Sequence, residues 1–341
     1  MRDAVVTGAS GWLGQNLVRA LAAEGRERIR CLVPDADSAP LLELASTAVD
    51  VVVGDVRDPA TVDAVFEGMA GATVFHAAAI IHPQKRPREL FDVNVGGTQL
   101  VLDRARRAGT GRFLHVSSNS PFGANPTPEH RFTEDSPYSP YLAYGRSKHE
   151  AEQLVLRSHE RGDVEAVILR PPWFYGPFQP ARQTQWLSTV RRGRFPLVGD
   201  GTNRRSMVFT GNLVHGLLRA EAADADVAGG RAYWIADEEP YVMREVFETV
   251  RHAFELEGLP VSGRMQPRLP RLAGVVAEKV DTALQSAGVY LQAMHVLGEL
   301  KDTIACDIEG ARRDLGYDPP TTLLEGMRTS IRWCVERGHQ L

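Results

Sequence analysis

Short apolar runs alternate with segments of helical periodicity over the first half of the chain. The apolar runs, each about as long as one strand, are residues 3–7, 29–33, 49–53, 73–76, 113–116 and 166–169. Helical spacing of apolar residues marks the segments near 40–46, 59–68, 88–108 and 142–160. This alternation predicts an α/β protein in which crossover helices cover both faces of a parallel sheet.

A glycine-rich turn joins the first predicted strand to a helix that follows at once. The turn reads Gly8-Ala-Ser-Gly11-Trp-Leu-Gly14. Gly8 allows a tight turn, Gly11 lets the backbone approach a pyrophosphate, and Gly14 lets the helix pack on the strand. The helix N-terminus adds amide donors and a dipole that favours an anion. We therefore predict a dinucleotide-binding turn that consists of Gly8, Ser10, Gly11, Trp12, Leu13 and Gly14.

The ends of the next two predicted strands bear on the choice between NAD and NADP. An acidic side chain after the second strand would bond the ribose hydroxyls, whereas an arginine would hold the extra phosphate of NADP. Val33 occupies the usual place of the acid, no arginine follows, and Asp35 and Asp37 would repel a 2′-phosphate. We therefore expect NAD or NADP, with a preference for NAD. Asp55 follows the third strand and is either an adenine contact or an ordinary turn residue.

A tyrosine and a lysine stand four residues apart in the predicted helix over 142–160. Tyr144 and Lys148 would share one helix face, about one turn apart. A free tyrosine has a pKa of about 10, and a cation within ~6 Å favours the phenolate and lowers that pKa. Such a pair can move a proton on and off an alcohol or carbonyl oxygen while a cofactor moves a hydride. The spacing alone is also typical of a solvated helix face, and the upstream dinucleotide turn favours the catalytic interpretation.

The bulk composition is that of an ordinary globular enzyme, with 341 residues, 43% hydrophobic and 24% charged. The net charge of -4 gives no general attraction to nucleic acid. No segment is apolar for the ~18 residues that a membrane span needs, and the N-terminus has no signal-peptide layout, so we expect a cytoplasmic protein. Cys31, Cys306 and Cys334 are odd in number and far apart, which predicts reduced, buried thiols and no metal site.

With these pieces assembled, the sequence resembles the extended short-chain dehydrogenases/reductases, which include nucleotide-sugar epimerases, dehydratases and 3β-hydroxysteroid dehydrogenases. The resemblance covers nearly the whole chain. The segments that carry it are residues 7–14, Gly54-Asp55, 76–79, 94–98, 116–118, Tyr144 with Lys148, Arg170-Pro171, 175–177 and 314–317. Their order and spacing together are specific to the superfamily, whereas no single segment is.

The resemblance implies a doubly wound Rossmann sheet with a smaller, interleaved C-terminal substrate lobe. The dinucleotide-binding domain would comprise residues 1–170, completed by about 208–236. The substrate lobe would consist mainly of residues 171–207 and 237–341. The predicted helices near 88–108 and 142–160 resemble the pair that forms the dimer in this family, so we expect a homodimer.

The resemblance also implies roles for individual residues. Tyr144 would transfer the proton, and Tyr141 would not, because only Tyr144 lies four residues before Lys148. Lys148 would bond the nicotinamide ribose and lower the pKa of the tyrosine. Ser118, with Ser117 as the fallback, would donate to the substrate oxygen. The cofactor contacts expected beyond the glycine turn are Asp35, Asp55, Val56, Ala77, Ala78, Asn94, Tyr144, Lys148 and Pro171.

The second half of the chain gives mixed signals about the substrate. Arg205 matches an arginine that clamps the diphosphate of nucleotide sugars, or it is a surface loop arginine. Trp173 stands where those enzymes have a substrate-contacting asparagine, and Asn119-Ser120 replaces the acid–base pair of the dehydratases. Residues 269–300 form a long, largely apolar helical stretch, which resembles the cover of an apolar pocket in the steroid and alkyl-ketone branch. Core packing or a dimer contact is the alternative for this stretch.

These observations favour an enzyme that transfers a hydride reversibly between a nicotinamide and a small molecule. The reacting group would be a secondary alcohol or ketone on a fairly apolar substrate, contacted by Ser118, Trp173 and Arg205. A nucleotide-sugar 4-epimerase is the first alternative. A dinucleotide sensor without enzymatic activity is the second, and the joint presence of Ser118, Tyr144 and Lys148 argues against it.

Overall fold

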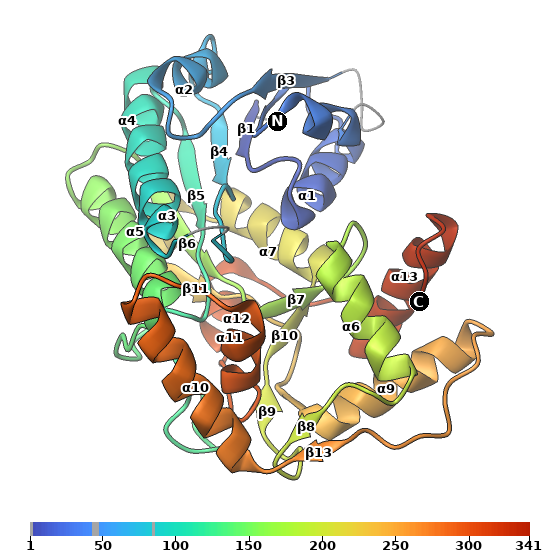
Figure 1. Ribbon diagram of the computed structural model, residues 1–341. Coiled ribbons are helices and arrows are strands. Elements are labelled where there is room, and N and C mark those ends of the chain that lie inside the picture. The colour runs from blue at the N-terminus through green and yellow to red at the C-terminus, as the bar shows by residue number, and fades with distance from the viewer. Residues whose placement is uncertain (1–2, 43–47, 84–85) are drawn as a thin grey trace.

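The computed structural model describes residues 3–42, 48–83 and 86–341, and a parallel sheet lies at its centre (Figure 1). Seven strands are hydrogen-bonded in the order β11-β6-β5-β4-β1-β2-β3. The strands are β1 (Ala4–Thr7), β2 (Ile29–Val33), β3 (Val49–Val53), β4 (Thr73–His76), β5 (Arg112–Val116), β6 (Ala166–Arg170) and β11 (Ala232–Trp234). All neighbouring pairs are parallel. The predicted doubly wound sheet is confirmed, and its strand order reverses between β1 and β4.

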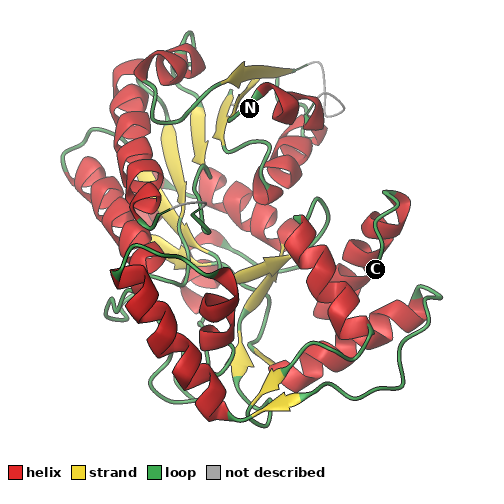
Figure 2. Cartoon of the chain, viewed as in Figure 1, coloured by secondary structure: helices red, strands yellow, loops and turns green. Residues whose placement is uncertain are grey.

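Helices cover both faces of the sheet (Figure 2). One layer holds α1 (Trp12–Ala23) and α7 (Thr210–Ala222), and the other holds α2 (Pro59–Phe66), α4 (Thr98–Ala108) and α5 (Leu142–Glu160). Successive residues of a strand point to opposite faces. Ala4 and Val6 therefore join the core under α1 and α7, while Val5 joins the core under the other layer. Burial on both faces explains why these strands are continuous apolar runs in the sequence.

The helix predicted over 88–108 is interrupted by a π-helical turn. α3 (Arg88–Phe91) leads into the turn η2 (Asp92–Gly97), and α4 follows it directly. Gly97 packs so closely on Val56 that an added Cβ would lie 2.8 Å from Cγ1 of the valine. The Thr98 hydroxyl donates to the carbonyl of Asn94 at 2.6 Å. Turns of this kind are frequent at functional sites, and this one contains Asn94.

The helix predicted near 40–46 also differs from the structure. Residues Ala36–Leu41 form a 3-10 helix, η1, whose first turn is capped by Asp35. Pro40 lies inside this helix and cannot donate a backbone hydrogen bond, which disfavours a longer α-helix. Residues 43–46 of the predicted helix lie outside the described residues.

The second half of the chain forms its own core beside the sheet. The helices are α6 (Ala181–Arg191), α8 (Ala225–Ala228), α9 (Met243–Leu256), α12 (Glu309–Leu315) and α13 (Leu323–Glu336). The strands form three pairs, β7 (Trp173–Tyr175) with β10 (Met207–Phe209), β9 (Arg204–Arg205) with β12 (Tyr241–Val242), and β8 (Leu197–Val198) with β13 (Arg268–Leu269). Apolar residues of α6, α9, α13, β7 and β10 make up one cluster that is separate from the two sheet cores.

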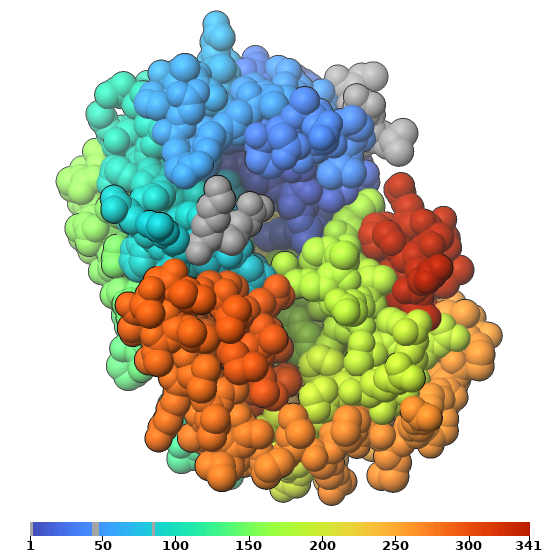
Figure 3. Space-filling model, viewed as in Figure 1, coloured from blue at the N-terminus to red at the C-terminus, as the bar shows by residue number. Residues whose placement is uncertain are grey.

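The predicted helical stretch over 269–300 is a hairpin of two helices, α10 (Arg271–Ser286) and α11 (Gln292–Glu299). Gly288 between them has a φ of +78°, which ends the first helix. The hairpin lies across from α6, and the molecular surface is hollowed between the two (Figure 3). Leu272 and Val276 of α10 are 67% and 53% exposed, so this face is not packed within the chain. Among the described residues, the helices are all too short or too polar to cross a bilayer.

Candidate active site

The glycine turn between β1 and α1 is packed so closely that side chains would not fit. Gly8 has a φ of +70°, and an added Cβ would lie 2.8 Å from the Cα of Ala78 at the end of β4. A Cβ on Gly14 would lie 2.2 Å from the carbonyl oxygen of Gly8. The turn therefore sits against Ala77 and Ala78, at the point where the strand order of the sheet reverses. Ligands of doubly wound sheets bind at this crevice.

The N-terminus of α1 faces this crevice with free donors. Gly11 is the N-cap and provides no side-chain cap, so the first-turn amides of Trp12 and Leu13 are available to an anion. The indole of Trp12 donates to the carbonyl of Pro177 at 2.9 Å and its ring lies 4.8 Å from that of Phe174. Trp12 thereby ties the glycine turn to the second half of the chain. Ser10 is half-buried beside it.

Asp35 and Asp55 follow β2 and β3 at the same edge of the sheet. The carboxylate of Asp35 accepts from the backbone N–H of Ser38 at 2.9 Å. Asp55 accepts from the backbone N–H of Arg57 at 2.8 Å and forms an ion pair with its guanidinium, which lowers the pKa of Asp55. Val33 is wholly buried. Asp35 and Asp55 thus each follow the end of a strand, where we expect the ribose and the adenine of the cofactor.

Tyr144 and Ser118 are brought together from different elements. Tyr144 lies in the first turn of α5, and Ser118 lies two residues after the end of β5. Ser118 lies close enough to Tyr144 to lower the pKa of the phenol. The Ser118 hydroxyl donates to the hydroxyl of Ser120 at 3.3 Å and accepts from the backbone N–H of Ser120 at 3.2 Å. The hydroxyls of Ser117 and Tyr141 are buried and have no partner among the described residues. The structure therefore brings Ser118 and Tyr144 to the same end of β5.

Lys148 is 2% exposed and lies one turn further along α5, against the end of β5. Its ammonium donates to the carbonyl of Val116 at 2.8 Å and lies 3.4 Å from Nε2 of His115. Burial lowers the pKa of Lys148 to about 8, although Glu152 acts to raise it. The lysine thus keeps a fixed place at the carboxyl edge of the sheet.

The pKa of Tyr144 moves in the direction opposite to our expectation. Burial raises it to about 12, the neighbouring Ser118 and the charge of Arg182 lower it, and the charge of Glu299 raises it. We expected Lys148 to lower this pKa. In the structure the ammonium is bonded to the end of β5 instead, and desolvation of the phenol is the larger effect.

A buried ion pair fixes α5 against the sheet. Arg170, at the end of β6, donates to Glu152 of α5 at 2.8 Å and 3.2 Å, and both side chains are almost fully buried. The hydroxyl of Tyr138 donates to the same carboxylate at 2.7 Å. At the other end of α5, a Cβ on Gly145 would lie 2.4 Å from the carbonyl oxygen of Ser120. These contacts set the height of Tyr144 above the end of β5.

Asn94 positions the loop after β4. Its amide donates to the carbonyl of Ile80 at 3.0 Å and to the hydroxyl of Ser147 at 3.0 Å, while its oxygen accepts from the N–H of Ile80 at 2.9 Å. Asn94 therefore joins the loop after β4 to α5. Val56 and Pro171 are both buried, after β3 and β6 respectively.

Arg205 and Trp173 do not line the hollow in the way a sugar-nucleotide enzyme would require. Arg205 is 7% exposed, and its guanidinium donates to the carbonyl of Glu299 at the end of α11. Burial lowers the pKa of Arg205, and Glu299 and Asp302 raise it. Trp173 is half-buried, with its ring 5.0 Å from that of Trp186. Arg205 thus holds the hairpin rather than presenting its charge to a ligand.

Other residues around Tyr144 were missed in the sequence. Arg182 of α6 acts electrostatically on Tyr144 and Tyr290. The loop between α10 and α11 places Tyr290 in a hydrogen bond with His82. Of these residues, only His82 carried a signal in the sequence, because it follows an apolar pair. Arg182 and Tyr290 come from distant segments whose packing no local pattern predicts.

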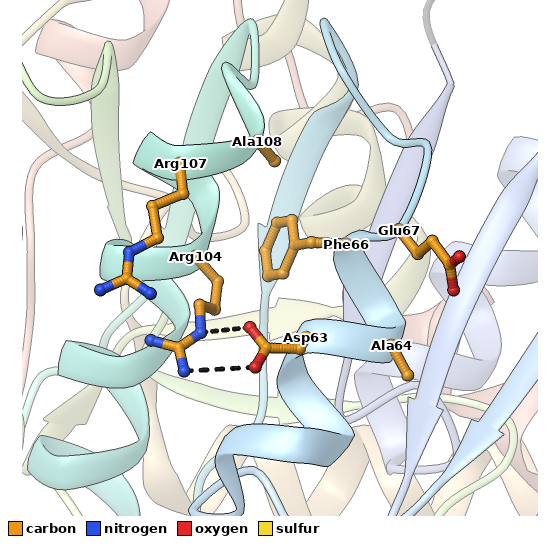
Figure 4. A pocket seen from close by; sticks show the side chains of 7 residues that line it. All are labelled: Asp63, Ala64, Phe66, Glu67, Arg104, Arg107 and Ala108. Atoms are coloured by element: carbon orange, nitrogen blue, oxygen red, sulfur yellow. Dashed lines mark hydrogen bonds and ion pairs between the residues drawn. The ribbon is translucent and has the colours of Figure 1, made fainter.

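A surface hollow of about 520 Å³ lies away from this site, between α2 and α4 (Figure 4). Figure 4 shows Arg104 and Asp63 joined across it, with Nε of the arginine 2.5 Å from the carboxylate. None of the candidate catalytic or cofactor residues lines this hollow. It therefore has no part in the argument on function.

Residues 4–236 match the NAD dependent epimerase/dehydratase family. The chain belongs to this family. The family includes extended short-chain dehydrogenases/reductases, which confirms that the chain is an enzyme. The family is NAD dependent, which confirms the expected cofactor class.

Three similar proteins match over nearly their whole length. The uncharacterized protein y4nL of Sinorhizobium fredii is 43% identical over 98% of this chain and 95% of its own. A 4-hydroxy-2-methyl-3-oxo-4-farnesyl-3,4-dihydroquinoline-1-oxide ketoreductase of Stigmatella aurantiaca is 30% identical, over 94% and 93%. A 2-alkyl-3-oxoalkanoate reductase of Stenotrophomonas maltophilia is 30% identical, over 95% and 97%. Two of the three are thus named as reductases of ketones.

The fold is also that of solved structures of this group. The UDP-glucuronic acid 4-epimerase of Bacillus cereus aligns with a TM-score of 0.77 at 18% identity, over 99% of this chain and 100% of the epimerase. At 18% identity this similarity establishes the fold of both halves of the chain and does not identify the substrate.

Proposed function

We propose that this enzyme transfers a hydride reversibly between NAD and a secondary alcohol or ketone on a fairly apolar substrate. The observation that carries the proposal is that Ser118, after β5, lies close enough to Tyr144 of α5 to lower its pKa, at the carboxyl edge of the sheet. The glycine turn at Gly8 and the N-terminus of α1 lie at the same edge of the sheet. A substrate oxygen bonded by both hydroxyls would therefore have its carbon beside a dinucleotide held at that turn.

Bound NAD would supply the hydride chemistry, and the chain would supply positioning and proton transfer. In ketone reduction, Tyr144 would give its proton to the ketone oxygen, while Ser118 would donate a hydrogen bond to the same oxygen. A pKa of about 12 keeps the phenol protonated at neutral pH, which suits this direction. In oxidation the same groups act in reverse, and Lys148 stabilises charge at the edge of the sheet.

The dinucleotide would extend along the carboxyl edge of the sheet. Residues 1–170, with about 208–236, would form the part that holds it, and 171–207 with 237–341 would mainly shape the substrate side. The contacts that we assign to NAD are Gly8, Ser10, Gly11, Trp12, Leu13, Gly14, Asp35, Asp55, Val56, Ala77, Ala78, Asn94, Tyr144, Lys148 and Pro171. Support comes from the tight packing of Gly8 on Ala78 and the uncapped first turn of α1.

Two observations support an apolar ketone over a nucleotide sugar. The guanidinium of Arg205 is bonded to the end of α11, so it is not offered to a diphosphate. Trp173 presents an indole where a sugar enzyme would present an amide. The reductase relatives act, by name, on a farnesylated dihydroquinoline oxide and on a 2-alkyl-3-oxoalkanoate, both of which carry alkyl or isoprenoid groups. The hairpin of α10 and α11 would cover the apolar part of such a substrate.

The test is turnover of Tyr144→Phe with NADH or NAD and a panel of aliphatic ketones and alcohols. We expect the substitution to leave NAD affinity nearly unchanged and to reduce turnover by about 10²–10⁴-fold, the usual contribution of a positioned acid or base. Tyr141→Phe is the matched control, because that hydroxyl is buried without a partner among the described residues. Equal turnover of the two variants would contradict the proposal, and activity on UDP- or GDP-sugars alone would favour the epimerase.

We further propose a cytoplasmic homodimer. The three cysteines are free and buried, as expected for a reducing compartment. α4 and α5 lie side by side on the outside of one sheet face, where a second copy could add its own pair (Figure 1). Light scattering of the purified chain should give about twice the 37.5 kDa of one copy, and a monomer mass at micromolar concentration would refute the dimer.

A further inference from the structure

The helix that carries Tyr144 begins with a strained residue. Leu142, the first residue of α5, has a φ of +51°, in the left-handed region that residues with a side chain rarely adopt. A conformation of this kind persists only where the surrounding contacts hold it. Tyr144 lies two residues later, so the contacts that hold Leu142 also set the start of the helix and the place of the phenol.

The cap of this helix comes from the hairpin of α10 and α11. Tyr141 is the N-cap residue and makes no side-chain cap hydrogen bond, so the N–H groups of the first turn need other partners. The side-chain oxygen of Gln285 in α10, which lies against α5 (Figure 1), accepts from the backbone N–H of Ala143 at 3.3 Å. Ala143 is the second residue of the helix, where a capping side chain usually bonds. Gln285 thus caps α5 from 142 residues away in the sequence.

Gln285 is itself held by a buried carboxylate. Its amide nitrogen donates to both oxygens of Asp281 at 3.1 Å, and Asp281 is wholly buried. The same carboxylate bonds to Nδ1 of His295 in α11 at 2.9 Å. Because an ionised carboxylate only accepts and a backbone N–H only donates, a single orientation of the Gln285 amide satisfies both neighbours. The two helices of the hairpin therefore fix the direction of the capping oxygen.

The hairpin has two further contacts with the segments around the site. The ring of His295 lies 5.5 Å from that of Tyr141, the residue that precedes α5. The hydroxyl of Tyr290, in the loop between α10 and α11, lies 2.5 Å from Nδ1 of His82 in the loop after β4. The hairpin therefore contacts both the segment that leads into α5 and the segment that leaves β4.

We propose that Gln285 is a positioning residue for Tyr144, and that the tyrosine stands in place for proton transfer only while the hairpin is docked on α5. The hairpin is also the element that we expect to cover the apolar part of the substrate. This contact therefore couples closure over the substrate to placement of the proton donor, so that water is excluded before the proton moves. The inference rests on the proposed hydride transfer and adds a means of controlling it.

The first test removes the cap and keeps the length of the side chain. For Gln285→Met, with NAD and an alcohol that the unaltered enzyme oxidises, we expect kcat to fall about 10- to 100-fold with little change in KM. A misplacement of about 1 Å can cost that much. NAD affinity in calorimetry should be unchanged, because Glu152 and Arg170 still hold the rest of α5. Gln292→Met is the matched control, since Gln292 is exposed at the start of α11 and makes no side-chain hydrogen bond with the described residues.

A rescue tests whether the hydrogen bonds themselves matter. Gln285→Glu alone sets two carboxylates side by side and should lower kcat as Gln285→Met does. In the double variant Asp281→Asn with Gln285→Glu, donor and acceptor are exchanged. The new amide donates to the new carboxylate, which still accepts from Ala143, and the net charge is that of the unaltered enzyme. The double variant should recover most of kcat, and a double variant no better than Gln285→Glu would overturn the inference.

Hydrogen exchange gives a readout that needs no turnover. In Gln285→Met the backbone N–H groups of residues 142–145 should exchange about 2- to 10-fold faster, as expected for the loss of one hydrogen bond. Gln292→Met should leave them unchanged. Exchange that is equal in the two variants would overturn the inference whatever the substrate is.

The outcomes separate this inference from the proposed function. A KM that rises in Gln285→Met while kcat stays the same would overturn the inference, because Gln285 would then serve only to bind the substrate, and the proposed hydride transfer would stand. Absence of turnover by the unaltered enzyme with every ketone and alcohol would overturn the proposed function. The exchange rates would then still decide whether Gln285 holds the start of α5.

Discussion

Glu152→Gln tests how strongly the helix that holds Tyr144 depends on one buried ion pair. Glu152 and Arg170 are both almost fully buried, and the carboxylate accepts three hydrogen bonds from Arg170 and one from Tyr138. The substitution leaves the guanidinium buried without its counter-charge. Breaking such a pair costs about 3–5 kcal/mol. With an unfolding entropy of about 2.1 cal/mol/K per residue, 341 residues give a fall in Tm of about 4–7 °C.

The assay is thermal unfolding followed by circular dichroism, together with turnover below the transition. Glu150→Gln is the control, because Glu150 is exposed on the same helix and has no ion pair with the described residues. Replacing Glu152 and Arg170 together by Met should recover most of the lost stability, since the uncompensated charge is then removed. A Tm for Glu152→Gln within one degree of the control would refute the reasoning. The pKa of Lys148 should also fall further, since Glu152 raises it.

Two further predictions concern the cofactor turn and a buried acid. Gly8→Ala should weaken NAD binding at least tenfold in calorimetry, because the added Cβ would lie 2.8 Å from the backbone of Ala78. Gly25 has a similar φ and open space around it, so Gly25→Ala should leave NAD binding unchanged. Equal effects of the two substitutions on NAD binding would contradict this prediction. Burial raises the pKa of Asp237 to about 6, so the folded chain binds more protons than the unfolded chain between about pH 4 and 6. Its contribution, on the order of 2–3 kcal/mol, is lost as pH rises through that range. The Tm of the enzyme minus that of Asp237→Asn should therefore fall from pH 4 to 6, and a constant difference would contradict it.

The sheet was predictable because each parallel strand is buried on both faces. The runs at 29–33, 49–53 and 73–76 coincide with β2, β3 and β4, since a short continuous apolar run between turns is typical of a strand covered by helices on both sides. The helix over 88–108 was predicted without its π turn. A π turn adds one residue to an α-helical turn, and this change is too small to be seen in the spacing of the apolar residues. That turn depends on the contact of Gly97 with Val56, which is a long-range packing effect.

The candidate site was predictable only where its residues share an element or a motif. Tyr144 and Lys148 follow from their spacing on one helix, and Ser118 follows from its place after β5. The direction of the Tyr144 pKa did not follow, because desolvation depends on what covers the phenol. The effect of Arg182 on Tyr144 could not be predicted, since nothing near Arg182 in the sequence shows that α6 lies across the hollow from the hairpin of α10 and α11.

Two arginines near the hollow show why residue type alone does not decide a role. Arg205 matched a sequence pattern for an anion site, yet it is 7% exposed and bonded to the end of α11. A partnered guanidinium in that position stabilises the hairpin, and a ligand would have to break that bond before it could bind. Arg182 matched no pattern, yet its charge lowers the pKa of Tyr144. The contacts that a folded chain gives each arginine, and not the sequence motif around it, therefore decide what its charge acts on.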